Sequence, residues 1–255
     1  MQSLICLLGL ATFVAAAWIV SSDRWRFPFR VVVGGLGLQF ALAFLVLKTE
    51  IGRRIFDAIG SGFELVLGSV SAGSGFLFSA GGDTEFVESF NDSLVGTFAF
   101  GVLPTVIFFS SLMSILYHLG VMQRVVWAMA WVMRFTLGTS GPETLAAAAN
   151  VFVGHTEAPL VVRPYLAKMT RSELNAMMTG GFATITGGLL GVYAGWDIDI
   201  SHLITASVIS APAALLIAKV MQPESTEVEL NASLEIASDE EDRHVNLIAA
   251  AVEGA

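Results

Sequence analysis

The chain has 255 residues, of which 55% are apolar and 14% are charged, and its mean hydropathy is +0.72. This composition excludes a soluble enzyme and indicates a protein whose surface faces lipid. The formal net charge of -9 arises largely from one segment, because residues 224–242 contain eight acidic residues and no basic residue.

Two apolar runs open the chain. Residues 4–20 contain the single cysteine, Cys6, so the chain has neither an internal disulfide framework nor a cysteine metal site. No Lys or Arg precedes this run, and it is longer than the roughly 7–15 residues of a signal-peptide core, so we predict a retained transmembrane helix. Residues 31–47 predict a second transmembrane helix, which completes a first region at residues 1–48.

The second region, residues 49–93, begins with charges interleaved among apolar side chains between residues 50 and 64. This spacing predicts an amphipathic helix in the membrane interface, followed by a Gly/Ser-rich turn region at residues 69–82. A solvated loop is the alternative interpretation.

The third region, residues 94–137, combines a long apolar run with an aromatic and basic segment. Residues 94–119 predict a third transmembrane helix of the scaffold type. Residues 122–137 contain Trp127, Trp131 and two arginines, which is typical of a segment anchored at the membrane interface.

The fourth region, residues 138–222, contains a carboxylate, Glu157, at a break between two apolar runs. Residues 145–152 and 160–167 are each too short to cross a bilayer, since a span needs about 20 residues. We therefore predict a re-entrant hairpin of two half-helices that meet at a polar tip. An ionisable residue at membrane depth indicates a functional site.

Two further transmembrane helices, residues 174–196 and 203–220, complete this gate and transport core. Gly187, Gly191 and Gly195 recur every four residues and permit close helix packing. Alternatively, the glycines and threonines of this span permit local unwinding, which exposes carbonyl oxygens to a cation. Both interpretations stay open.

The distribution of Lys and Arg predicts the orientation in the membrane. With the N-terminus outside, ten of these residues fall on the inner side and three on the outer side, as the positive-inside rule requires. The count holds only if residues 138–169 enter and leave on the cytoplasmic face, which supports the hairpin. We predict a multi-pass protein of the cell (inner) membrane.

The last region, residues 223–255, is an acidic loop followed by the start of an apolar helix. The predicted fold is thus an all-α polytopic membrane protein with about five transmembrane helices, an interfacial helix and one re-entrant helical hairpin. A broken element near the middle of the predicted spans is typical of the first half of an inverted-repeat transporter.

Specific motifs resemble the concentrative nucleoside transporter family. They are Ala-Ala-Ala-Asn at residues 147–150, Gly-His-Thr-Glu-Ala-Pro-Leu-Val-Val-Arg-Pro-Tyr-Leu at 154–166, Met-Thr-Arg-Ser-Glu-Leu at 169–174 and Met-Thr-Gly-Gly-Phe-Ala-Thr-Ile at 178–185. The resemblance implies a homotrimer that moves nucleosides inward with sodium by an elevator-like motion. It implies no organic cofactor and no nucleic-acid partner.

The resemblance also implies a substrate site and an ion site. The nucleobase would contact His155, Thr156, Glu157 and Leu189. Hydroxyl and carboxylate groups can hydrogen-bond the N–H groups of a base edge. At His155 the family commonly has Gln or a small residue, so nucleobase preference, purine or pyrimidine, stays open, as does the pH dependence, because imidazole titrates near pH ~6.5.

Sodium would be held by the Asn150 side chain, the Val153 and Ile185 carbonyls and the Thr184 hydroxyl. These four groups are oxygen donors, which suit a hard cation. Family members often have Ser at the position of Thr184, so the hydroxyl is retained. A proton-coupled carrier is the alternative to sodium coupling.

Three other interpretations remain beside this one. The chain is expected to correspond to the N-terminal portion of such a transporter, either a fragment inactive alone or the partner of a separately encoded C-terminal half. Glu157 is alternatively a cap for the second half-helix. An intramembrane enzyme using His155 and Glu157 is disfavoured, because no His-x-x-x-His pair is present, and we predict that the protein is not an enzyme.

Overall fold

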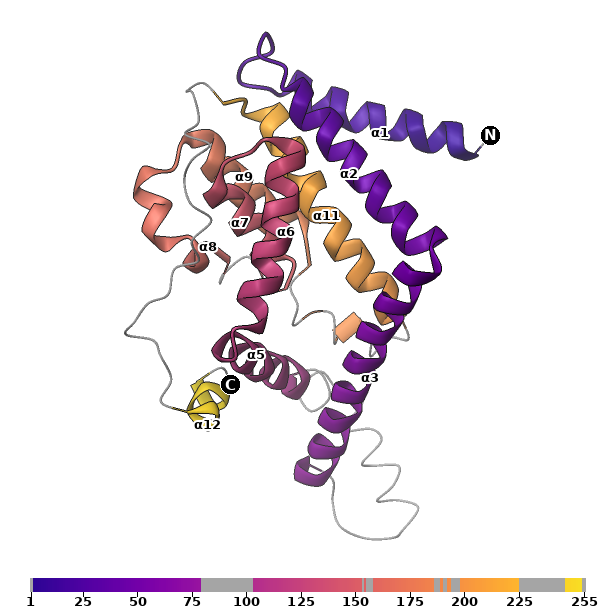
Figure 1. Cartoon of the computed structure of the whole chain (residues 1–255), viewed down its shortest axis with the longest axis vertical. Helices are drawn as coiled ribbons and strands as arrows, with labels where there is room; N and C mark the ends of the chain where they lie inside the picture. The colour runs from indigo at the N-terminus through magenta and orange to yellow at the C-terminus, as the bar shows by residue number, and fades with distance from the viewer. Residues whose placement is uncertain are drawn as a thin grey trace. The chain divides into compact units, whose positions relative to one another are not determined.

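A computed structural model of the chain describes residues 2–78, 103–152, 154, 158–185, 189, 192–193, 198–224 and 246–253. Within these residues the secondary structure is helical throughout, without strands, which confirms the predicted fold class at this level (Figure 1). The elements are α1 (Gln2–Ile19), α2 (Phe29–Lys48), α3 (Glu50–Phe78), α5 (Leu103–His118), α6 (Val121–Leu137), α7 (Gly141–Asn150), α8 (Ala158–Val161), the 3-10 helix η2 (Arg163–Lys168), α9 (Arg171–Ala183), α11 (Ile200–Met221) and α12 (Leu247–Glu253).

The chain forms two compact units. The first contains residues 1–44, 123–184 and 207–238, and the second contains residues 45–122, 185–206 and 239–255. The boundary therefore runs within α2, α6 and α11, and each unit is described by itself.

Two helices of the described residues have the length and composition of membrane spans. These are α2, with a mean hydropathy of 2.0, and α11, with 1.9. The apolar helices at residues 106–118 and 121–137, which are bent by 81° at their junction, make a third span if they cross together. The first predicted span corresponds to α1, a shorter apolar helix, and the start of the third predicted span, residues 94–102, lies outside the described residues.

The turn region predicted at residues 69–82 is wrong over its described part, because α3 continues to Phe78. The serine hydroxyls of α3 find acceptors within the helix: Ser61 Oγ donates to the Asp57 carbonyl (2.8 Å) and Ser69 Oγ donates to the Leu65 carbonyl (3.0 Å). Serine favours turns because its hydroxyl competes for backbone hydrogen-bonding groups. Here both hydroxyls bond within the helix, so the helix continues past them.

In the first unit, the glycines of α2 allow close helix contacts. A Cβ added at Gly34 would lie 3.0 Å from the Thr136 carbonyl carbon of α6, and closer still to its oxygen. A Cβ at Gly35 would lie 3.0 Å from Leu216 Cδ1 of α11, whereas Gly37 has no such neighbour. Gly34 and Gly35 thus let α2 approach α6 and α11.

Gly34→Ala is expected to destabilise the protein, because the methyl group meets the backbone of α6, which cannot rotate away. Overpacking of this kind costs about 1–3 kcal/mol, so the unfolding temperature in detergent should fall by several degrees. The matched control is Gly37→Ala, which adds the same methyl group to the same helix in open space. Equal unfolding temperatures for the two variants would contradict the close approach of α2 and α6.

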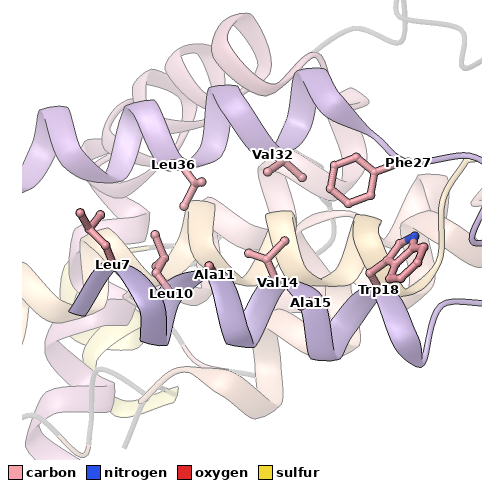
Figure 2. Close-up of a pocket in the computed structure, with 9 residues that line it drawn as sticks. All are labelled: Leu7, Leu10, Ala11, Val14, Ala15, Trp18, Phe27, Val32 and Leu36. Atoms are coloured by element: carbon pink, nitrogen blue, oxygen red, sulfur yellow. The ribbon is translucent and has the colours of Figure 1, made fainter. Parts of the chain in front are cut away.

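Apolar side chains hold α1, α2 and α11 together in the first unit. Ala17, Val32, Leu216 and Val220 form a buried cluster. Beside it, a groove of about 380 Å³ lies between α1 and α2, lined only by apolar residues such as Leu7 and by Trp18 (Figure 2).

In the second unit, α12 and α3 both contact α5. Ser111 Oγ of α5 donates to the Ala251 carbonyl of α12 (2.7 Å). Asp199 Oδ1 accepts from the backbone N–H of Ser201 at the start of α11 (2.8 Å). Hydrogen bonds from the His202 side chain and then from its backbone hold the pKa of the Asp199 carboxyl below its usual range. This cap explains why α11 begins earlier than the predicted residue 203.

Candidate functional site

The first element of the predicted hairpin is α7, and all ten of its residues are buried. Ser140 precedes it in an extended conformation and Pro142 lies in its first turn, where a missing N–H has no cost. The Glu143 side chain accepts the Ser140 backbone N–H (2.8 Å), which ties the start of the helix to its first turn. These local signals start α7 at Gly141, earlier than the predicted residue 145.

Asn150 ends α7 and is 4% exposed. Its amide nitrogen donates to the Gly180 carbonyl of α9 (2.9 Å) and makes a short contact to Thr184 Oγ1. Its amide oxygen, Oδ1, is buried and accepts no hydrogen bond from the described residues. A buried acceptor without a donor is unfavourable unless a donor or a cation completes it.

Thr184 lies where α9 ends. The helix stops at Ala183, and Thr184 has extended backbone angles (φ -123°, ψ 154°). Its hydroxyl donates to the Gly180 carbonyl (2.8 Å) while it accepts from Asn150, so one lone pair of the hydroxyl stays available. A continuous helix over residues 174–196 was therefore the wrong prediction, and the break at Thr184 is the local unwinding that was the alternative.

The buried Asn150 amide and the half-buried Thr184 hydroxyl form, with the Gly180 carbonyl, a neutral set of oxygen atoms in the first unit. Neutral oxygens and an acceptor without a donor suit a hard monovalent cation, for which amide, hydroxyl and carbonyl oxygens are ordinary ligands. No group of three His, Cys, Asp or Glu side chains among the described residues could hold a metal ion. Of the predicted sodium ligands, the structure brings Asn150 and Thr184 together.

The remaining predicted site residues are placed less fully. Val153, His155, Thr156 and Glu157 lie outside the described residues. Ile185 directly follows Thr184, and Leu189 is 40% exposed; both belong to the second unit.

Between α7 and α8, Gly154 has a positive φ of 116°. L side chains rarely adopt this conformation, so a glycine is required there. The Gly154 carbonyl then accepts the Ala158 N–H (2.9 Å), which starts α8. The second predicted half-helix, residues 160–167, is instead the short α8 followed by η2. Pro164 lies in this 3-10 helix, where it lacks the N–H that an α-helix needs.

Two polar residues near the site were missed in the sequence. Ser207 of α11 is buried, and its hydroxyl donates to the Val151 carbonyl directly after α7 (3.1 Å). Lys219, taken as a charge at the end of a span, is also buried. The only sequence signal was a polar side chain inside an apolar run, which does not say what it contacts.

The comparisons with known proteins match both units of this architecture. A family model described as "Na+ dependent nucleoside transporter N-terminus" matches residues 8–80, and one described as "Nucleoside recognition" matches residues 99–196. The human protein named "Sodium/nucleoside cotransporter 1" is 44% identical over 227 residues, which are 89% of this chain and 33% of that protein. The rat "Sodium/nucleoside cotransporter 2" is 46% identical over 226 residues.

The chain is also similar to solved structures of a protein named CNTnw. The structure titled "CNTnw in an inward-facing substrate-bound state" has a TM-score of 0.87 and 39% identity, and the match covers 100% of this chain and 59% of that one. A doubly substituted variant of the same protein in an outward-facing state has a TM-score of 0.86. The chain spans about a third of the length of the curated relatives, with 33% coverage of the human protein.

Proposed function

We propose that the chain belongs to the sodium-dependent nucleoside transporter family and that it acts in the inward transport of nucleosides across a cell membrane, coupled to sodium. The observation that carries this proposal is the contact between the buried Asn150 and the half-buried Thr184, together with an Asn150 Oδ1 that accepts no hydrogen bond from the described residues. Because the chain spans 33% of the human relative, the activity is proposed for the whole protein that contains these residues.

Sodium is the co-transported substrate in this proposal. Asn150 supplies its amide oxygen and Thr184 its hydroxyl, and the carbonyls of Val153 and Ile185 complete the set by their places in the matching motifs. Sodium in this set would neutralise the partial negative charge of the buried oxygens. Ion binding then favours the arrangement in which α7 and the end of α9 lie together, which is how an ion is coupled to a conformational change.

The nucleoside is proposed to bind beside the ion, at the hairpin tip. The Thr156 hydroxyl and the Glu157 carboxylate would hydrogen-bond the nucleobase edge, with His155 and Leu189 beside it. Hydrogen bonds in a low-dielectric site discriminate strongly, because an analogue without the matching group leaves a buried carboxylate unpaired.

For the membrane arrangement, we propose an extracellular N-terminus, a cytoplasmic re-entrant hairpin and a homotrimer with an elevator-like motion. The excess of ten Lys and Arg residues against three supports the orientation. The family resemblance supports the trimer and the elevator motion.

Uptake of radiolabelled uridine and adenosine by proteoliposomes tests the function. We expect uptake with an inward sodium gradient and none when choline replaces sodium. Uptake driven by a pH gradient without sodium would establish the alternative proton-coupled carrier. If neither the sodium gradient nor the pH gradient drives nucleoside uptake, the proposal is contradicted.

His155→Gln is expected to change the ratio of purine to pyrimidine uptake and to flatten the pH profile. The imidazole gains a proton near pH ~6.5 and then has two donors and no acceptor, whereas Gln keeps both at every pH. Uptake should be measured from pH 5.5 to pH 8 at saturating sodium, with the exposed His202→Gln as the matched control. Identical profiles and ratios for His155→Gln and the unsubstituted protein would remove His155 from the nucleobase site.

A further inference from the structure

A largely buried charge cluster lies at the start of α7. It is formed by Glu143, Ser172, Glu173, Lys219 and Glu224. The Lys219 ammonium nitrogen lies 2.7 Å from Glu143 Oε2 on α7, and these side chains are 5% and 0% exposed. It also donates to Ser172 Oγ on α9 (3.0 Å). Its third contact is Glu224 Oε2, just after α11 (3.1 Å). The ammonium group thus makes an ion pair with α7 and hydrogen bonds to α9 and to the segment after α11.

The carboxylates of the cluster also accept hydrogen bonds from groups other than Lys219. Glu143 accepts from the Ser140 N–H (2.8 Å) and Glu173 from the Thr170 N–H (2.8 Å). The Thr170 hydroxyl donates to Glu224 (3.1 Å). Lys219 is the only cation among the buried side chains of the described residues, so removing it leaves the Glu143 and Glu224 carboxylates without their ion-pair partner.

The cluster is connected to the proposed ion site through α7. Glu143 and Asn150 are seven residues apart, which is about two helical turns and roughly 10 Å, so both lie on the same side of the helix. That side faces α9, with Ser172 near one end and Gly180 near the other; Figure 1 shows α7 and α9 close together. Ser207 of α11 holds the carbonyl after Asn150. Both ends of α7 are therefore bonded to α9 or α11.

We propose that Lys219 is a positioning residue for the sodium site. By holding Glu143, Lys219 sets the place of α7 along α9, and this places the Asn150 side-chain amide beside Thr184. The inference rests on the proposed sodium coupling and extends it to residues that do not touch the ion. Lys219 is distinct from a residue that only stabilises the fold, because its loss should weaken sodium binding beyond its effect on stability.

A double-mutant cycle separates the two roles. The variants are Lys219→Met, Glu143→Gln, the combined Glu143→Gln/Lys219→Met and the conservative Lys219→Arg. The matched control is Arg54→Met, which breaks the exposed Arg54–Glu50 pair (3.4 Å). The purified whole protein that contains these residues is titrated with sodium chloride against choline chloride, and sodium binding is measured as the rise in unfolding temperature, which requires no nucleoside.

Lys219→Met should raise the sodium concentration for half-maximal stabilisation roughly 10-fold or more, as is typical when a group that orients a metal ligand is removed. The combined variant should regain part of its thermal stability in choline, because the fully buried Glu143 carboxylate is then replaced by a neutral amide, while its sodium affinity stays low. Lys219→Arg should recover sodium affinity in part, and Arg54→Met should change neither quantity.

The inference is overturned if sodium affinity in the combined variant returns together with stability, or if sodium stabilises all variants equally or none. Uptake of uridine by the same preparations separates this outcome from failure of the proposed function. Sodium stabilisation that depends on Lys219 without any nucleoside uptake would leave the positioning role standing and reject transport.

Discussion

Asn150→Ala is expected to reduce sodium-stimulated nucleoside uptake to near the level measured in choline. The substitution removes a buried amide oxygen that accepts no hydrogen bond from the described residues, and it removes the two contacts that hold the end of α7 to Gly180 and Thr184. Loss of a ligand should cost at least as much as loss of an orienting group, which is about 10- to 100-fold in ion affinity.

The half-saturating sodium concentration for uptake is the quantity to measure, with Asn175→Ala as the matched control. The Asn175 amide also donates to a backbone carbonyl, that of Ala218 (3.1 Å), outside the proposed ion site. Its loss should cost about 1 kcal/mol of stability and leave the sodium dependence unchanged. If both variants keep the sodium dependence of the unsubstituted protein, Asn150 is not an ion ligand.

Glu157→Gln is expected to abolish most sodium-dependent uridine uptake. Gln has nearly the same size and keeps one acceptor, so the variant removes the charge and replaces the second acceptor oxygen by an N–H donor. A hydrogen bond to a charged group contributes about 1.5–3 kcal/mol, which corresponds to roughly 10- to 100-fold in transport efficiency at low uridine concentration.

The exposed Glu50→Gln is the control, because it removes the same charge outside the proposed site. Uptake should be measured in membrane vesicles at matched protein levels, with sodium affinity determined in parallel. A selective loss of uridine affinity supports nucleobase contact. Unchanged uptake rejects the assignment of Glu157 to the substrate site, and loss of thermal stability with normal uridine affinity indicates its alternative role as a helix cap.

Much of the helical architecture was predictable, because hydrophobicity over about 20 residues is a property of one segment. The runs at residues 31–47 and 203–220 correspond to α2 and α11. Both helices extend beyond the predicted ends, because hydropathy patterns define helix boundaries poorly. The motifs at residues 147–185 resemble the family whose models and relatives the comparisons match.

Predictions based on composition failed where small residues can belong to either a helix or a turn. The serines and glycines after Ser69 were assigned to a turn, but α3 continues through them to Phe78. Residues 174–196 show the opposite error: a continuous helix was predicted, but α9 stops at Ala183. Gly and Ser have weak intrinsic preferences in apolar segments, so their neighbours in space decide.

The sequence by itself determined that the chain is a helical membrane protein, where its longest helices lie, and which residues could supply oxygen ligands. Only the tertiary structure decided which of those groups meet. Asn150 bonds to Gly180 and Thr184, 30 and 34 residues away. Lys219 looked like a charge at a membrane boundary, yet it is buried against Glu143. The physical reason is that helix formation depends on neighbours within a few residues, whereas satisfying a buried polar group depends on the partner that packing brings to it.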